Sequence, residues 1–280
     1  MGLNKINSYA KINLALNIIG KTKKLHKIET IVSFIDLHDK ILIKSIKSKK
    51  HRIYFCGKFS KNINSNNTVS KLLKILDQKK FLNKKFYVKI TKNIPQKAGL
   101  GGGSMNAASI LKYFIKKKII RISEKQLLQV ASQVGSDVVL GLSPINTILS
   151  SKNKLKRFKN CKKLYTLVVK PNFGCSTRNI YYHVKKFNKI KLNNPTKRMF
   201  NFDFLKKMNN SLEEIALNRH SLLKRIKSYL INLENPIFVR MTGSGSSLVS
   251  YYNSKKQCDK AKKQFNRDYK KYWCISSKTI

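Results

Sequence analysis

The chain has 280 residues, of which 41% are hydrophobic and 10% aromatic. This length allows one or two domains with a sizeable core, and the composition excludes a largely disordered protein. The formal net charge of +48 ordinarily indicates a nucleic-acid or anionic membrane partner, but Lys, Asn and Ile are in excess along the whole chain, so we interpret the charge as compositional drift.

The five cysteines, at positions 56, 161, 175, 258 and 274, are odd in number, widely spaced and without a C-x-x-C pair. Neither a disulfide framework nor a zinc site is predicted from them. The sequence shows no secretory signal pattern and no apolar run long enough to span a bilayer. We therefore expect a cytoplasmic protein with no membrane partner and no specific nucleic-acid partner, and the sequence leaves its oligomeric state open.

Residues 8–19 alternate strongly and predict a strand whose apolar positions 12, 14, 16 and 18 share one face. Lys11 and Asn13 share the opposite face, where they either donate hydrogen bonds into a cleft or form the wet side of an edge strand. Residues 28–46 continue with short alternating segments, which predict hairpin strands interrupted at residues 36–39.

A glycine-rich loop, residues 95–108, separates an alternating strand at 86–91 from an amphipathic helix, and another helix is predicted over 68–76. Glycines let the backbone approach a ligand closely, and a helix N-terminus attracts phosphate through its unpaired N–H groups. The position suits the triphosphate of a nucleotide. A flexible turn between strand and helix is the alternative interpretation of this loop.

Ser123 and Gln126 form a capping-box pattern that predicts a helix ending at Gly135, so Asp137 follows a helix stop. Considered alone, an aspartate in this position is more often an N-cap or turn residue than a catalyst.

The second half of the chain is predicted to form a small α+β layer. Strands are predicted over 164–170, 237–241, 248–252 and 272–275, and helical segments over 203–231 and 255–265. A turn at 172–177, a polar loop at 185–200 and a second glycine turn at Thr242–Ser247 connect them. We place the domain boundary in the polar segment near residues 150–160, which gives domains 1–155 and 156–280.

Three segments, Ala10–Leu14, Pro95–Ala108 and Gly243–Gly245, occur in the order of the three motifs of the GHMP small-molecule kinases, which the chain resembles over nearly its whole length. With Gly135–Val138, they are most similar to the branch that phosphorylates the 2-hydroxyl of 4-diphosphocytidyl-2-C-methyl-D-erythritol in the non-mevalonate isoprenoid pathway. The resemblance implies an α+β fold with two domains, a ribosomal S5 domain 2-like N-terminal domain and a ferredoxin-like C-terminal domain.

The resemblance also implies site residues. Lys11 and Asp137 are the catalytic pair, in which Asp137 accepts the hydroxyl proton and Lys11 holds both the carboxylate and the reacting hydroxyl and offsets negative charge. ATP, with Mg²⁺ whose protein ligands are unassigned, lies along the loop. The ATP-binding residues are Pro95, Gln96, Lys97, Ala98, Gly99, Leu100, Gly101, Gly102, Gly103, Ser104 and Met105. The residues that bind the cytidine diphosphate-linked substrate are Asn13, His26, Tyr181, Gly243 and Ser244.

The chain departs from this family pattern in several places. Lys23-Lys24-Leu25-His26 stands where the family has Asp-Gly-Tyr-His, so Leu25 replaces an aromatic that stacks on cytosine beside Tyr181. Lys97 replaces a glycine and Met105 a serine, and both changes bear on ATP affinity. Two alternatives are another GHMP kinase, of the homoserine or mevalonate type, and a basic nucleic-acid-binding protein of S5-like fold.

Overall fold

The computed structural model describes residues 4–23 and 25–280, so Lys24 of the departing motif lies outside the described residues. The chain divides into two compact units, each built from several segments. Unit 1 comprises residues 1–11, 37–96 and 101–144, and unit 2 comprises residues 12–36, 97–100 and 145–280. The predicted domain boundary between residues 155 and 156 stays a prediction.

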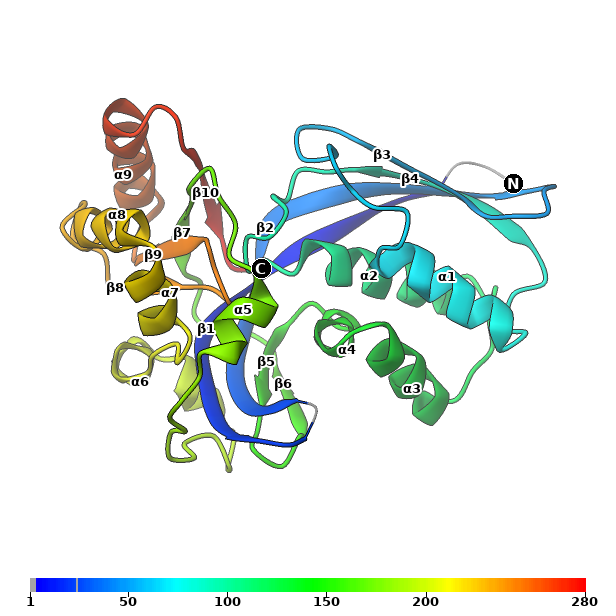
Figure 1. Cartoon of the computed structure of the whole chain (residues 1–280), viewed down its shortest axis with the longest axis horizontal. Helices are drawn as coiled ribbons and strands as arrows, with labels where there is room; N and C mark the ends of the chain where they lie inside the picture. The colour runs from blue at the N-terminus through cyan, green and yellow to red at the C-terminus, as the bar shows by residue number, and fades with distance from the viewer. Residues whose placement is uncertain (1–3, 24) are drawn as a thin grey trace. The chain divides into compact units, whose positions relative to one another are not determined.

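Two long strands contribute residues to both units: β1 (Asn4–Lys21) and β2 (His26–Ile46) (Figure 1). Their sheet also contains β3 (Arg52–Cys56), β4 (Lys85–Thr91), β5 (Asn146–Leu149) and β6 (Leu155–Phe158). The strand order is β3-β4-β2-β5-β6, and β1 pairs with β2. β3 runs parallel to β4, whereas β4 and β5 run antiparallel to β2, with Lys40 opposite Thr91 and Thr30 opposite Leu149.

For these strands, the structure excludes one of two alternative interpretations and shows one expectation to be wrong. Lys11 and Asn13 are 4% and 2% exposed, so this side of β1 is buried and the interpretation as a wet edge fails. β2 also continues unbroken through residues 36–39. The charge of Asp39 was one reason to predict an interruption. Asp39 is nevertheless accommodated within the strand, because its carboxylate accepts hydrogen bonds from the backbone N–H groups of Asn93 and Ile94.

Unit 1 places four helices on one face of its strands, as Figure 1 shows for α1 (Thr68–Gln78), α2 (Gly102–Lys116), α3 (Glu124–Val134) and α4 (Ser136–Gly141). α1 begins at a capping box in which Asn67 and Ser70 bond each other's backbone N–H. Its apolar stripe packs with Phe114 of α2 and Val88 of β4 in one buried cluster. This packing holds α2, which directly follows the glycine-rich loop.

Unit 2 contains an antiparallel sheet of order β10-β7-β9-β8, formed by β7 (Tyr165–Lys170), β8 (Phe238–Met241), β9 (Leu248–Tyr252) and β10 (Trp273–Lys278). Its helices are α5 (Thr177–Tyr182), the 3-10 helix η1 (Lys197–Phe200), α6 (Phe202–Lys207), α7 (Glu213–Arg219), α8 (Ser221–Ile231) and α9 (Lys255–Asp268). The predicted helical stretch 203–231 is therefore three helices, and the predicted α+β class is confirmed. Within the described residues, no helix is long and apolar enough to cross a membrane.

Candidate active site

Lys11 of β1 and Asp137 of α4 form an ion pair in unit 1. Lys11 Nζ lies 3.2 Å from Asp137 Oδ2, and the side chains are 5% and 36% exposed, respectively. The ammonium is thus held in a nearly buried position beside a carboxylate that keeps one side open to solvent. An open carboxylate next to a fixed positive charge has the arrangement needed to accept a proton from a bound hydroxyl group.

Local sequence explains the position of Asp137. α3 starts at the predicted Ser123–Gln126 capping box, and the extended Gly135 connects it to α4. Asp137 lies in the first turn of α4, where the helix dipole favours a negative charge. α4 packs tightly, because a Cβ on Gly141 would lie 2.7 Å from the Cβ of Ala108 on α2. The carboxylate is therefore supported by close contact with the helix that follows the glycine-rich loop.

The end of the glycine-rich loop that leads into α2 packs against Lys11. Gly101 has a φ of 68°, a left-handed conformation that favours glycine, and α2 begins at the next residue. A Cβ on Gly101 would lie only 2.8 Å from Lys11 Cγ, so the backbone approaches the lysine more closely than any side chain would allow. Among the described residues, no side chain caps the first turn of α2, which leaves a helix N-terminus of the kind that binds phosphate.

Residues 97–100 of the loop belong to unit 2 and are held there by the second glycine turn. Thr242 is fully buried; its Oγ1 accepts a hydrogen bond from Asn13 N at 3.0 Å and donates one to Gly99 O at 3.1 Å. The Thr242 carbonyl also occupies the space where Gly99 would carry a Cβ. One hydroxyl thus connects β1, the loop and the glycine turn. Sequence reasoning missed Thr242, although it begins the turn that the motif analysis singled out.

Lys97 adopts the conformation expected of the residue it replaces. Its φ is 50°, in the left-handed region, which a glycine adopts freely and a residue with a side chain adopts at a cost of about 1–2 kcal/mol. A Cβ on Gly174 would lie 2.6 Å from the Cβ of Lys97, so Gly174 makes room for the lysine stem. The lysine therefore occupies a left-handed position that a glycine would occupy without strain.

The residues predicted to bind the second substrate lie in unit 2. Asn13 Nδ2 donates to Thr30 Oγ1 at 2.9 Å, which holds the amide against β2. Ser244 Oγ lies 2.8 Å from Thr177 Oγ1 at the start of α5, next to Gly243 in the glycine turn. These contacts are polar and uncharged, in contrast to the ion pair of unit 1.

Two rings also come together in unit 2. The His26 and Tyr181 rings are tilted at 45° with centroids 5.2 Å apart. Burial lowers the pKa of His26 below its ordinary value, and the positive charge of Lys21 lowers it further. The side chain of Leu25, which precedes His26 in the chain, is 72% exposed. The structure thus brings the predicted aromatic and histidine together, with an exposed aliphatic side chain at the position of the missing aromatic.

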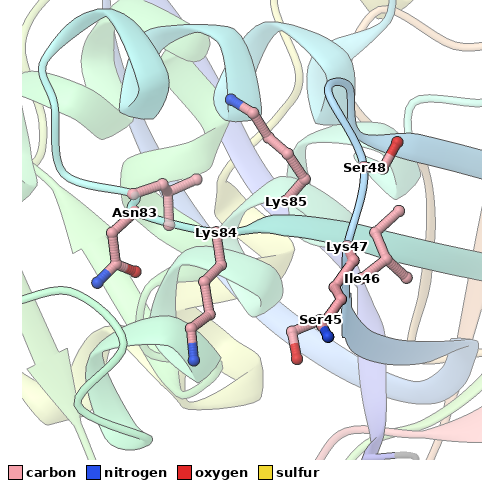
Figure 2. A pocket seen from close by; sticks show the side chains of 8 residues that line it. Ser45, Ile46, Lys47, Ser48, Asn83, Lys84 and Lys85 are labelled. Atoms are coloured by element: carbon pink, nitrogen blue, oxygen red, sulfur yellow. The ribbon is translucent and has the colours of Figure 1, made fainter.

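Unit 1 also has a surface groove. Figure 2 shows it between the end of β2 and the segment that leads into β4. It is lined by Ser45, Ile46, Lys47, Ser48, Leu82, Asn83, Lys84 and Lys85. None of the predicted catalytic or binding residues lines it. Over residues 4–23 and 25–280, no group of three or more His, Cys, Asp or Glu side chains is arranged to hold a metal ion.

Comparison with known proteins supports the motif analysis. The family model for the GHMP kinases N terminal domain matches residues 67–147, which include the glycine-rich loop and Asp137. Among solved structures, that of a 4-(cytidine 5'-diphospho)-2C-methyl-D-erythritol kinase superposes with a TM-score of 0.78 at 20% identity, covering 99% of this chain and all of the other. A homoserine kinase from Cytophaga hutchinsonii superposes with a TM-score of 0.75 at 13% identity, covering 100% and 95%. These structures share the fold.

Sequence similarity distinguishes the branches of the family. A 4-diphosphocytidyl-2-C-methyl-D-erythritol kinase of Pelagibacter ubique (strain HTCC1062) is 56% identical over 277 residues, which cover 99% of each chain. The kinase of the same name from Clostridium botulinum (strain Loch Maree / Type A3) is 34% identical over 88% of this chain and 90% of its own. The chain therefore belongs to the 4-diphosphocytidyl-2-C-methyl-D-erythritol kinase family of the GHMP kinases.

Proposed function

We infer that the protein is an ATP-dependent kinase that phosphorylates the 2-hydroxyl of 4-diphosphocytidyl-2-C-methyl-D-erythritol in the non-mevalonate isoprenoid pathway. The observation that carries this inference is the 56% identity to a kinase of that name over 99% of both chains. The fold supports the class of enzyme but does not select the acceptor, because a homoserine kinase superposes almost as well.

In the proposed mechanism, Asp137 is the general base and Lys11 its partner. The acceptor hydroxyl oxygen attacks the γ-phosphorus of ATP, its proton passes to the Asp137 carboxylate, and the bond to the β–γ bridging oxygen breaks to release ADP. The 3.2 Å contact with Lys11 Nζ orients the carboxylate toward the place where the hydroxyl must arrive. Positioning and charge stabilisation are the main contributions that a protein makes to phosphoryl transfer.

We place the ATP phosphates along residues 95–105. The fit rests on the left-handed Gly101, whose missing side chain leaves the backbone free to approach an anion, and on the open first turn of α2. Mg²⁺ would neutralise phosphate charge, and it commonly binds through substrate phosphates and water with only one or two protein carboxylates. Such a site requires no cluster of acidic side chains.

The acceptor residues in this proposal are those of unit 2. The two tilted rings of His26 and Tyr181 provide a surface for the cytosine, and Asn13, Gly243 and Ser244 provide polar groups for the remainder of the substrate. The division into a GHMP N-terminal domain over 1–155 and a C-terminal domain over 156–280 stays part of the proposal. So does a location in the cytoplasm, where a small-molecule kinase meets ATP.

The deciding experiment is a panel of hydroxyl substrates with ATP and Mg²⁺, followed by ADP release. We expect turnover with 4-diphosphocytidyl-2-C-methyl-D-erythritol and at least about a hundredfold lower kcat/KM with homoserine, with mevalonate and with methylerythritol phosphate lacking the cytidine group. Preference for homoserine or mevalonate would assign the chain to another acceptor. Salt-sensitive RNA binding without turnover of any compound would contradict the kinase assignment.

A further inference from the structure

Outside the catalytic pair, unit 1 contains a fully buried carboxylate that the proposed mechanism does not use. Asp39 lies in the middle of β2 and is fully buried. Its Oδ1 accepts hydrogen bonds from two consecutive backbone N–H groups, Asn93 at 2.7 Å and Ile94 at 2.8 Å. These residues follow β4 and directly precede the glycine-rich loop. One oxygen of Asp39 therefore holds the segment through which the chain enters the loop.

The other oxygen of Asp39 holds the segment through which the chain leaves the loop. Asp39 Oδ2 accepts a hydrogen bond from Asn106 Nδ2 at 3.0 Å, and Asn106 lies in the second turn of α2. The Asn106 Oδ1 atom has no hydrogen-bond partner among the described residues. The Asn106 amide thus uses only its NH₂ group, which is the group that can donate to a carboxylate.

Lys92 completes this group as the counter-charge. Its ammonium forms an ion pair with Asp39 Oδ2, and the lysine is 4% exposed. The same Nζ lies 3.2 Å from the place that a Cβ on Gly102 would occupy, so the ammonium is packed against the first residue of α2. A buried positive charge at this point would be costly without Asp39, since an unpaired charge loses its hydration and gains nothing in return.

We propose that Asp39 is a positioning residue for the phosphate loop: one buried carboxylate joins both ends of residues 95–105 and thereby sets the course of the backbone that receives ATP. This inference rests on the proposed function, in which that loop binds the nucleotide. A carboxylate suits the task because four donors converge on it, and it offers two acceptor oxygens where an amide offers only one.

A buried ion pair that only stabilises the fold is the competing explanation, and kinetics separate the two. We expect Asp39→Asn to raise the KM and the Kd for ATP about tenfold, the usual consequence of losing a buried hydrogen bond to a charged group. The KM for the cytidine substrate should stay within about twofold, because ATP is the ligand that the loop receives. Calorimetric ATP binding and steady-state kinetics provide the two readouts.

The structure also offers a rescue. In Asp39→Asn combined with Asn106→Asp, the oxygen of the new amide accepts from Asn93 and Ile94, while its NH₂ group donates to the new carboxylate on α2, which also pairs with Lys92. The double variant keeps the charge and the bridge with the carboxylate moved to the helix. We expect it to restore the ATP KM to within about threefold of wild type, whereas additive damage from the two changes would overturn the proposal.

Asp77 provides the matched control in the same unit. It pairs with Lys85 at 2.6 Å at the start of β4, whereas the Asp39 group lies beyond the end of that strand. Asp77→Asn should lower the melting temperature without changing the ATP KM. Equal effects of Asp39→Asn and Asp77→Asn on ATP and on acceptor, in proportion to lost stability, would reduce Asp39 to a structural residue.

Two further measurements keep the proposal falsifiable. Should Asp39→Asn not fold, Asn106→Ala removes one arm and keeps the ion pair, and an unchanged ATP KM in that variant would overturn the inference. Amide hydrogen exchange at residues 101–105 should accelerate in Asn106→Ala relative to Asp77→Asn. A wild-type protein that turns over no ATP would contradict the proposed function instead, so the two failures are distinguishable.

Discussion

The ion pair of unit 1 and the ring pair of unit 2 differ in how much freedom their surroundings leave. Lys11 is nearly buried, touches Asp137 at 3.2 Å and lies where Gly101 has no room for a methyl group. The rings of His26 and Tyr181 meet at a tilt of 45°, and Leu25, which precedes His26 in the chain, is largely exposed. A proton transfer needs two atoms at a set distance, whereas an apolar face is provided by more than one kind of side chain. The departures from the family pattern accordingly include Leu25 and leave Lys11 and Asp137 in place.

The largest expected effect comes from removing the base. Asp137→Asn should lower kcat about a hundredfold or more and leave ATP affinity within a few-fold of wild type, because the amide keeps the shape of the side chain but accepts no proton. Single-turnover kinetics and calorimetric ATP binding measure the two quantities. Near-normal turnover in this variant would show that Asp137 is not the general base. The contrast between the ion pair and the ring pair would then have no catalytic basis.

A methyl group at Gly101 should come next. Gly101→Ala places a Cβ 2.8 Å from Lys11 Cγ on a backbone with a φ of 68°. We expect kcat/KM for ATP to fall roughly tenfold or more, since the left-handed conformation costs a side chain about 1–2 kcal/mol and the lysine must also move. The control is Gly20→Ala, whose Cβ would meet only Lys27 at an ordinary contact distance of 3.8 Å.

Equal kinetics for the two alanine variants would mean that the loop tolerates displacement and that unit 1 is less constrained than its packing indicates.

Restoring an aromatic side chain at position 25 should improve binding of the cytidine substrate. Leu25→Tyr is expected to lower the KM for the cytidine substrate severalfold with little change in kcat, because stacking on a base is worth about 1–3 kcal/mol and leucine recovers only part of that. Tyr181→Ala should raise the same KM. Both variants are compared on substrates with and without the cytidine group, and indifference to that group would contradict the placing of the base at these residues.

The smallest effect concerns protonation of His26. Because burial and Lys21 lower the pKa of His26, the imidazole should be neutral at pH 7 and titrate below its ordinary 6.5. A lowered folded-state pKa means that protonation opposes folding, so the contribution of this group to stability is complete above 6.5 and is lost as the pH falls through the folded-state pKa. The KM for the cytidine substrate should be flat from pH 7 to 8 and rise only as the pH falls below 6.5, through the lowered pKa of His26.

Proton NMR of the histidine ring gives the midpoint directly, and His26→Gln should flatten the KM profile. A midpoint above 6.5 would reverse the sign of this prediction.

Much of the candidate site was accessible from local sequence. Alternation identified β1 and β4, the Ser123–Gln126 box located the start of α3, and the glycine-rich loop was placed between a strand and a helix, as the structure has it. These patterns depend on neighbours in the chain, so they are readable without a fold. The assignment of Lys11 and Asp137 as a pair came from the family resemblance, and they do lie in contact.

Contacts between distant segments were not accessible in the same way. Asp39 was interpreted as part of a break between strands because a charge in an alternating segment usually marks solvent, yet its partners are 53 to 67 residues away in sequence. Thr242 lies 143 residues from the loop carbonyl it binds. No local pattern encodes such pairings.

By itself, then, the sequence determined the alternating strands β1 and β4, the cap of α3, the α+β class and the family, since each follows from periodicity, turn chemistry or ordered motifs. Only the tertiary structure decided that Lys11 and Asn13 are buried, that β2 runs on through Asp39, and that one carboxylate and one threonine hold the ends and the middle of the glycine-rich loop. The physical reason is that the cost of burying a charge or a hydroxyl depends on which donors and acceptors the fold brings to it, and these come from remote parts of the chain.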